Sequence, residues 1–138
     1  MGERSHIDLE VLSEEECRNL LARRNLGRVA LTVDDQPEVF PVNYIADEST
    51  IVFRTAEGTK LRQAAKRRVA FEIDDWDPRA GVGWSVMVKG VAQDVTDALD
   101  RFGAALHALP VVPLAPGSRE HWMAIYPSEV TGRRFRVP

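Results

Sequence analysis

Two kinds of hydrophobic repeat alternate along the chain. Between Ser13 and Arg24, apolar side chains recur every three to four positions, at Cys17, Leu20 and Leu21, which is typical of an amphipathic helix. Ser13 is followed three residues later by a glutamate. This spacing often starts a helix, because each side chain can satisfy the other residue's backbone N–H. The sequence therefore predicts a helix from Ser13 to about Arg24.

From Gly27 onward, apolar residues alternate with polar ones, which is the period of a half-buried strand. Pro41 interrupts the second of these segments and indicates an edge strand or a bulge. Most connections between the segments are short, which favours antiparallel pairing. The pattern predicts a mainly β domain with peripheral helices, folded as a small barrel or a sandwich. The expected strands cover residues 27–33, 38–46, 51–55, 69–74, 84–95, 122–126 and 130–137.

Two further helices are expected, over Lys60–Arg68 and Asp97–Leu109. Residues 75–83 and 110–118 are rich in proline and glycine and are expected to form loops. Residues 1–10 lack any periodicity and are expected to form an N-terminal arm. The length of 138 residues suits one domain, which we place at residues 11–138.

Composition narrows the class of protein. Hydrophobic residues make up 44% and charged residues 28% of the chain, as in ordinary globular domains. A net charge of −3 is the opposite of what a nucleic-acid-coating surface carries, so no nucleic acid partner is expected. No apolar run approaches the length of a membrane span, and the charged N-terminus does not look like a secretory signal. We therefore expect a cytoplasmic protein with no membrane partner.

The usual catalytic and metal-binding motifs are missing, so no catalytic residue and no metal ligand is predicted. The single cysteine, Cys17, excludes a disulfide framework and a multi-cysteine zinc site. The acidic residues of 74–77 suggest a metal cluster, but acids at a strand end are usually solvated. The histidines lack metal-ligand spacing and are interpreted as surface or loop residues: His6, His107 and His121.

The segment from Phe53 to Leu61 contains a concentration of groups that bind anions. A strand ends at Thr55, and Gly58 allows a close backbone approach before a short helix begins. Hydroxyls and cations are typical phosphate ligands, and four of them lie within seven residues: Arg54, Thr55, Thr59 and Lys60. The alternative is a capped helix after a strand, with ordinary exposed charges.

Two tryptophans stand at the start of expected strands. Trp84 is followed by the hydroxyl of Ser85, and Trp122 begins a later strand. Tryptophan more often fills a core than lines a ligand site. A planar cofactor would nevertheless need aromatic walls and a few polar donors.

The order of these motifs resembles the pyridoxamine 5'-phosphate oxidase-like family of flavin-binding split β-barrels. The resemblance covers residues 11–136, almost the whole chain. Each motif alone is weak, but the set in this order and spacing is fairly specific. The motifs are 25–30, 36–44, 51–55, 58–61, 69–74, 83–86, 89–92 and 130–134.

The resemblance implies an antiparallel split β-barrel that forms a homodimer, with two flavin mononucleotide (FMN) sites at the dimer interface. The family's phosphate-binding stretch matches Arg54, Thr55, Thr59 and Lys60. The stretch that lines the isoalloxazine ring matches Pro41, Val42, Asn43 and Tyr44, mainly through backbone groups. Trp84 and Ser85 match a position that reaches the cofactor, often from the second subunit, and Trp122 is expected to help close the site.

The implied function is an FMN-dependent oxidoreductase that acts on a small-molecule substrate. Oxidation of pyridoxamine phosphate itself is not expected, because Arg133 and Arg134 do not clearly match the family's basic substrate-binding set. The arginine-rich, lysine-poor composition leaves a deazaflavin as an alternative cofactor, held by a basic groove at Arg62, Arg67 and Arg68. A carrier that binds flavin or haem without turnover is the other alternative.

Overall fold

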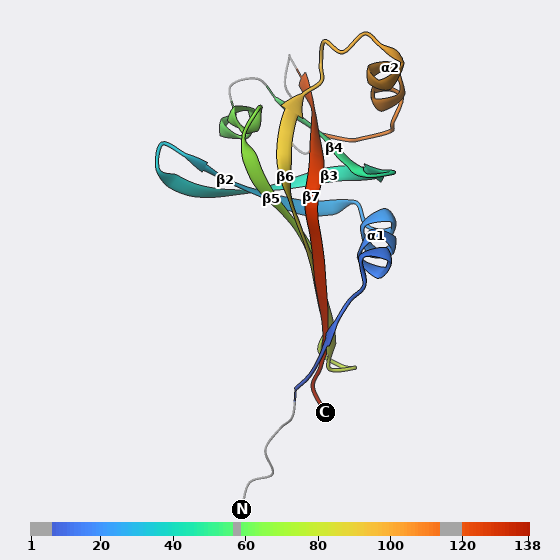
Figure 1. Cartoon of the computed structure of the whole chain (residues 1–138). Helices are drawn as coiled ribbons and strands as arrows, with labels where there is room; N and C mark the ends of the chain where they lie inside the picture. Colours follow the sequence, from blue (N-terminus) through green and yellow to red (C-terminus); the bar gives the residue numbers. More distant parts are fainter. Residues whose placement is uncertain (1–6, 57–58, 114–119) are drawn as a thin grey trace, which may run out of the picture.

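The computed structural model describes residues 7–56, 59–113 and 120–138. The described residues form a seven-stranded sheet with two α-helices and one 3-10 helix, so the predicted mainly β fold with peripheral helices is confirmed (Figure 1). None of the described helices is long and apolar enough to cross a membrane. The elements are β1 Asp8–Val11, α1 Glu14–Arg23, β2 Leu26–Val33, β3 Gln36–Asp47, β4 Thr50–Ala56, η1 Lys60–Ala64, β5 Arg68–Asp77, β6 Val82–Asp94, α2 Arg101–His107 and β7 Glu120–Arg136.

The sheet closes on itself. Its strand order is β1-β7-β4-β3-β2-β5-β6, and β6 also pairs with β7, so strands β2 to β7 form a ring. All the pairings between these strands are antiparallel. Strand β1 lies outside the ring and pairs with the end of β7. The predicted antiparallel barrel is therefore confirmed.

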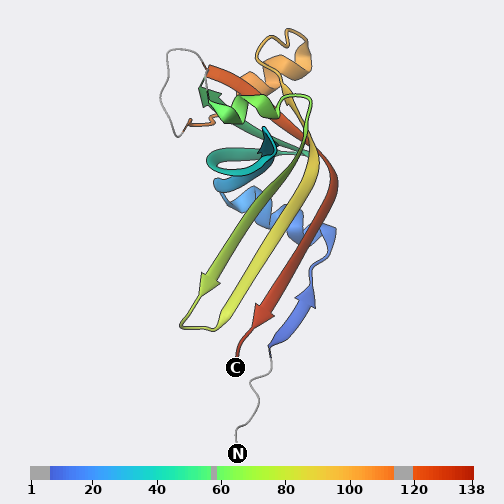
Figure 2. The same ribbon diagram turned by 90° about the vertical axis from the view of Figure 1, so that its left-hand side faces the viewer.

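Three strands extend beyond the barrel. The last parts of β5 and β7, the first part of β6 and the added strand β1 form a ribbon that projects from one end (Figure 2). The β6–β7 register shifts between Lys89 and Gly90. A Cβ atom on Gly90 would lie 2.2 Å from the carbonyl oxygen of Tyr126, so only glycine allows β7 to approach this closely. Because β6 and β7 stay paired on both sides of this register shift, β7 continues as one strand, whereas the sequence predicted two.

The barrel interior is a continuous apolar core. It includes Tyr44, Phe53 and Phe71, which are completely or almost completely buried. A second cluster forms on the outside of β4 and β7, where Val52 and Ala124 pack with Leu106 of α2. Both faces of β4 and β7 are therefore buried in this region, which holds the end of the barrel near η1 and α2 in a defined shape.

The first predicted helix is confirmed. The hydroxyl of Ser13 accepts a hydrogen bond from the backbone N–H of Glu16 at 3.1 Å, and the Ser13 N–H donates to the Glu16 carboxylate at 3.3 Å. Residues 8–10 of the expected N-terminal arm belong to β1, because their backbone groups pair with β7. Residues 1–6 of that arm, and residues 114–118 of the loop predicted at 110–118, lie outside the described residues.

Three boundaries differ from the prediction. The loop expected at 75–83 is a short turn, because β5 runs to Asp77 and β6 begins at Val82. The helix expected over Lys60–Arg68 is only the 3-10 helix η1, because Lys66 adopts a left-handed backbone (φ 64°) and its N–H bonds to Ala92. The helix expected from Asp97 begins at Arg101, where the side chain of Asp100 caps it.

Candidate functional site

The barrel wall opens between β3 and β4. The two strands pair only from Tyr44–Phe53 to Asp47–Thr50, while the first part of β3 runs along β2 instead. This divergence leaves a pocket of about 280 Å³. It brings together both stretches that the sequence singled out, the predicted phosphate segment and the predicted ring segment. The lining residues are Phe40, Pro41, Val42, Arg54, Thr55, Ala56, Thr59 and Leu61.

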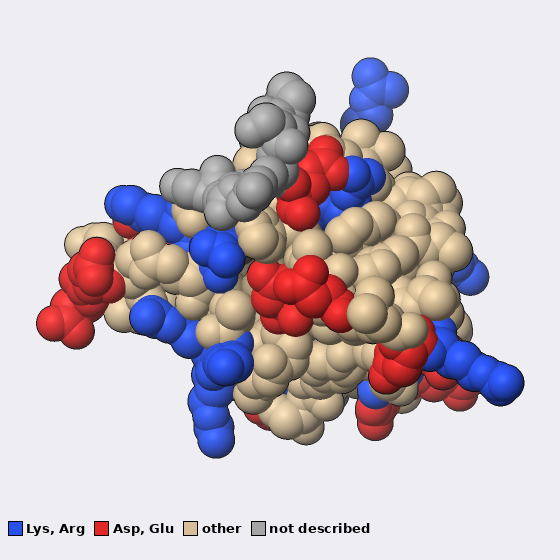
Figure 3. All heavy atoms as spheres, turned by 90° about the horizontal axis from the view of Figure 1, so that it is seen from above, with Lys and Arg blue, Asp and Glu red and all other residues tan. Residues whose placement is uncertain are grey.

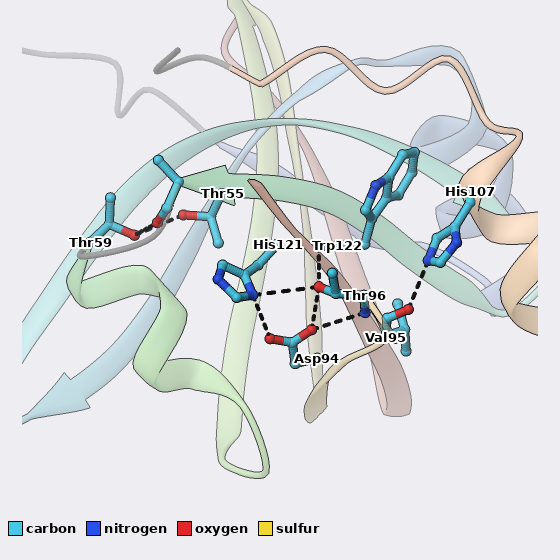
Figure 4. Close-up of polar contacts among 9 residues, drawn as sticks. Thr55, Thr59, Asp94, Val95, Thr96, His107, His121 and Trp122 are labelled. Atoms are coloured by element: carbon cyan, nitrogen blue, oxygen red, sulfur yellow. Dashed lines mark hydrogen bonds and ion pairs between the residues drawn. The ribbon is translucent and has the colours of Figure 1, made fainter. Parts of the chain in front are cut away.

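Two threonine hydroxyls form a pair at this pocket. Thr55 is buried, and its hydroxyl oxygen lies 2.8 Å from that of Thr59 (Figure 4). The Thr59 hydroxyl donates to the carbonyl oxygen of Ala56 at 2.9 Å. The proton between the two threonines therefore comes from Thr55. Because hydroxyls rotate freely about the C–O bond, Thr55 can redirect its proton to an anion that enters the pocket.

Arg54 lines the pocket, but its guanidinium group is held on the other side of β4. One terminal nitrogen donates to the carbonyl oxygen of Val111 at 2.9 Å, the other pairs with Glu120, and the group lies 5.0 Å from the ring centre of Trp122. The Nε atom is buried and has no partner among the described residues. Trp122 also packs against the ring of His107. Trp122 thus supports Arg54 and is not among the residues that line the pocket.

Lys60 stands beside the pocket and does not line it. Its ammonium group donates to the carboxylate of Glu38 at 2.8 Å. That hydrogen bond and the negative charge of Glu38 raise the pKa of Lys60. The lysine is therefore a charged group that would have to leave Glu38 to contact a ligand in the pocket.

The predicted ring-binding stretch is divided between the pocket and the core. The side chain of Tyr44 is buried, and its hydroxyl donates to the carbonyl oxygen of Leu21 at 2.7 Å. Burial raises the pKa of Tyr44 far above its ordinary value. The backbone N–H of Tyr44 donates to Asn25. Asn43 is half-buried at the end of the β2–β3 pairing.

Trp84 and Ser85 lie on the projecting ribbon and are not among the residues that line the pocket. The guanidinium of Arg24 lies 5.0 Å from the Trp84 ring centre, on the side of the ribbon that α1 covers. Ser85 faces the opposite side, since successive residues of a strand point in opposite directions. The predicted contact of this pair with a cofactor from a second subunit stays a prediction.

One polar cluster beside the pocket was missed in the sequence. His121 was interpreted as a surface or loop residue, which is wrong: it lies on β7 with 14% of its side chain exposed, and its Nδ1 is 2.9 Å from a carboxylate oxygen of Asp94. Burial raises the pKa of Asp94, but hydrogen bonds from Thr96 and His121 outweigh it and lower the pKa overall. His121 stands opposite Thr55 in the β4–β7 register. His121 is not among the residues that line the pocket, and it is placed near them by the pairing of β7 with β4.

Charged groups of both signs are interspersed at the end of the barrel that carries η1 and α2 (Figure 3). Positive side chains there have acidic neighbours, as in the pairs Arg54–Glu120 and Lys60–Glu38. An anion bound at this end would therefore depend on individual donors in the pocket and not on a broad basic surface.

The family described as pyridoxamine 5'-phosphate oxidase matches residues 13–134 of the chain. The chain belongs to the pyridoxamine 5'-phosphate oxidase-like family. Its fold is the split β-barrel of that family, and the resemblance seen in the sequence is confirmed. An uncharacterized protein of Mycobacterium tuberculosis, Rv0080, is 36% identical over 132 residues, which are 90% of this chain and 84% of that protein.

Solved structures of related proteins have the same fold. The FAD binding protein from Mycobacterium smegmatis is 42% identical, with a TM-score of 0.76, and the match covers 91% of this chain and 97% of that one. A conserved protein of unknown function from Corynebacterium diphtheriae is 29% identical, also with a TM-score of 0.76, and the match covers 92% of this chain and 98% of that one.

Proposed function

We propose that the protein is a flavin-binding oxidoreductase of the pyridoxamine 5'-phosphate oxidase-like family. The observation that carries this proposal is the pocket between β3 and β4, where Pro41 and Val42 meet Arg54, Thr55 and Thr59. Segments of two successive strands, one suited to a phosphate and one to a flat ring, therefore share one opening in the barrel wall.

The chemistry of the pocket fits a flavin phosphate. The β3–β4 pairing starts only at Tyr44, so the backbone of β3 at residues 40–43 faces the opening without pairing to β4. Backbone N–H and C=O groups of this kind can meet the polar edge of an isoalloxazine ring. The hydroxyl pair Thr55–Thr59 supplies donors for a phosphate, and the positive charge of Arg54 lies on the other side of β4.

The residues predicted to bind the phosphate and the ring then have roles in binding or orientation. Thr55 and Thr59 hold the phosphate by hydroxyl donation, and Arg54 and Lys60 neutralise its charge. Pro41 cannot donate a backbone hydrogen bond, and the Tyr44 N–H is used by Asn25, so the ring edge is met by residues 42 and 43. A bound flavin would supply the hydride and electron transfer, while the protein's residues fix its position and exclude water.

We propose FMN as the cofactor, because the pocket offers one phosphate site beside one ring site. FAD is the second candidate, since it contains the same ribityl phosphate and a 42% identical relative is described as an FAD binding protein. The adenosine part of FAD would have to lie outside the pocket. A pocket of about 280 Å³ is at the lower limit of ordinary ligand sites, roughly 300–1,000 Å³. A second surface is thus needed to enclose either flavin.

A second copy of the chain is the proposed source of that surface. The outer face of the sheet, defined by β1, β3, β5 and β6 side chains that point away from the core, exposes Leu9, Val11, Val39, Trp76 and Met87 by 39–79%. Apolar groups on one extended face mark an interaction site. The same face contains a groove of about 590 Å³ beside Val39.

The cofactor pocket adjoins this outer face. Pro41, which lines the pocket, stands opposite Arg28, and the row continues through Glu72 to Met87. Ser85 lies two residues before Met87 on β6, so its side chain points to the same side of the sheet. A homodimer formed through the outer face would bring Ser85 of one subunit toward the pocket of the other, as the family resemblance implies.

The function is tested by identifying the cofactor. Protein purified from an expression host is denatured, and the released small molecules are identified by mass and absorbance. The stripped protein is then titrated with FMN, FAD and a deazaflavin. We expect FMN to bind tightest, and tighter FAD binding would favour the second candidate. Preference for the deazaflavin would replace both. If none binds at micromolar concentration, the proposed function is wrong.

A further inference from the structure

His121 reaches the end of the barrel interior that holds the threonine pair. It stands opposite Thr55 on neighbouring strands, and side chains in such positions lie on the same face of the sheet. Figure 4 shows the imidazole between Asp94 on one side and the Thr55–Thr59 pair on the other. The ring is therefore beside the proposed phosphate site, although no sequence motif indicates this.

The hydrogen bonds around His121 determine where its protons are. The Thr96 hydroxyl accepts the backbone N–H of Trp122 at 2.9 Å, so its own proton goes to Asp94. The Thr96 N–H also donates to Asp94 at 2.9 Å. Asp94 is thus an ionised acceptor, and the Nδ1 of His121 at 2.9 Å must carry a proton. The protonation of Nε2 alone decides whether the ring is neutral or positive.

The Nε2 atom of His121 is buried and has no partner among the described residues. A buried polar atom left in this state is unfavourable, whether it carries a proton or a lone pair. When Nε2 carries a proton, Asp94 balances the charge of the ring, and the proton needs an acceptor that the described residues do not supply. A ligand phosphate oxygen would accept the Nε2 proton.

We infer that His121, oriented by Asp94, is a further ligand of the phosphate and makes its binding depend on pH. This inference rests on the proposed flavin site and adds a residue to it. The ring donates to phosphate only when Nε2 is protonated, so phosphate binding is coupled to proton uptake. Affinity for the phosphate should therefore fall as the pH rises and Nε2 loses its proton.

Two cations near this end of the barrel have acidic partners. Arg54 of β4 pairs with Glu120 of β7, and Lys60 of η1 pairs with Glu38 of β3. His107 of α2 bonds to the carbonyl oxygen of Val95 at 2.8 Å and packs on Trp122, on the outer side of β7. His107 is thus a matched control: an imidazole near the site whose ring faces another part of the protein.

The test compares FMN with riboflavin, which has the same ring and no phosphate. Affinities of the stripped wild-type protein, His121→Gln, Asp94→Asn and His107→Gln are measured by flavin fluorescence from about pH 5.5 to about pH 8.5. The FMN phosphate also titrates in this range, so the ratio of wild-type to variant affinity at each pH is the informative quantity. We expect a ratio of about tenfold or more for His121→Gln at the lowest pH, declining toward one at the highest.

The outcomes separate this inference from the proposed function. Asp94→Asn should follow His121→Gln, His107→Gln should follow the wild type, and riboflavin should show no pH-dependent ratio. A constant ratio for FMN, or the same decline for riboflavin, would overturn the inference while flavin binding stands. Absence of any flavin binding would overturn the proposed function. In that case NMR of the His121 ring during titration with inorganic phosphate tests whether His121 binds phosphate. An unchanged Nε2 signal counts against the inference.

Discussion

Trp76 and Phe135 stack across Gly83, with ring centroids 5.6 Å apart and planes inclined by 19°. The three residues stand directly opposite one another on β5, β6 and β7, and Leu9 of β1 completes the row. A Cβ atom on Gly83 would lie 2.4 Å from the Phe135 ring and 2.8 Å from the Trp76 ring. The missing side chain of Gly83 therefore allows the two aromatic rings to cover the ribbon.

Gly83→Ala should destabilise the protein by about 1–3 kcal/mol, because the added methyl group forces both rings out of position. Denaturant unfolding at fixed protein concentration measures the change. Phe135→Ala removes the ring that the methyl group would meet, so the double variant should lose less stability than the sum of the two single variants. If the losses of stability in the two single variants add up to that of the double variant, the contact between the added methyl group and Phe135 is not the cause of the destabilisation.

The proposed dimer can be disrupted at its outer face. Val39 is 61% exposed and Met87 is 39% exposed on this face. Replacing either with aspartate would place an unpaired charge in the interface. Val39→Asp and Met87→Asp should therefore sediment as monomers at concentrations where the wild type is a dimer. They should also bind FMN more weakly, because the second subunit completes the site.

Leu99→Asp is the matched control for these two variants. Leu99 is 95% exposed and lies before α2, outside the outer face. The same chemical change there should leave the sedimentation coefficient as in the wild type. A monomeric wild type at low micromolar concentration would contradict the interface, and so would Val39→Asp and Met87→Asp variants that remain dimeric.

Lys60 is predicted to contribute one ionic contact to the phosphate. Lys60→Ala should weaken FMN binding, because the variant loses a charge-assisted hydrogen bond to the phosphate. Riboflavin binding should be unchanged, and equilibrium titration measures both. Glu38→Gln removes the carboxylate that holds Lys60 at 2.8 Å, and should strengthen FMN binding or leave it unaltered.

Lys66→Asn controls for the loss of one nearby positive charge. Lys66 is exposed and adopts φ 64°, a conformation that asparagine tolerates well. We expect no change in FMN affinity for this variant. If Lys60→Ala and Lys66→Asn weaken binding equally, Lys60 acts only through the general charge of the surface and not as a phosphate ligand.

The elements that the sequence predicted well are those with local signals. The Ser13–Glu16 capping box identified α1, and the two-residue alternation identified the strands. The segment around Thr55 and Thr59 was recognised because its donors lie close together along the chain. The structure then placed it beside Pro41 and Val42. The positions of most strands follow from such local periodicity, and the antiparallel pairing follows from the short connections.

The features that the sequence did not predict depend on pairing between distant segments. Asp94 and His121 are 27 residues apart and meet only because β6 pairs with β7. The sequence pattern predicted two strands where β7 is one strand of 17 residues. The close approach at Gly90 that maintains the pairing depends on β6. These contacts have no pattern within a single segment.

The last prediction concerns Glu72, which lies on the outer face between Arg28 and Asp74. Burial, followed by the hydrogen bond and the negative charge of Asp74, raises the pKa of Glu72 to about 7, and Arg28 offsets only part of this effect. The folded protein therefore holds a proton on Glu72 at pH values where the unfolded chain has released it. Stability from this group is fully present below about pH 4.5 and is lost as the pH rises through about 7.

Glu72→Gln keeps the shape of the protonated side chain and removes the titration. The variant should therefore unfold at a higher denaturant concentration than the wild type above about pH 7, and the difference should shrink as the pH falls toward 4.5. Unfolding midpoints measured across this range at fixed protein concentration check the prediction. Glu129→Gln, a change at an exposed glutamate on the same face, should leave the pH profile unaltered. A Glu72→Gln profile parallel to the wild type at every pH would show that Glu72 is already ionised in the folded protein.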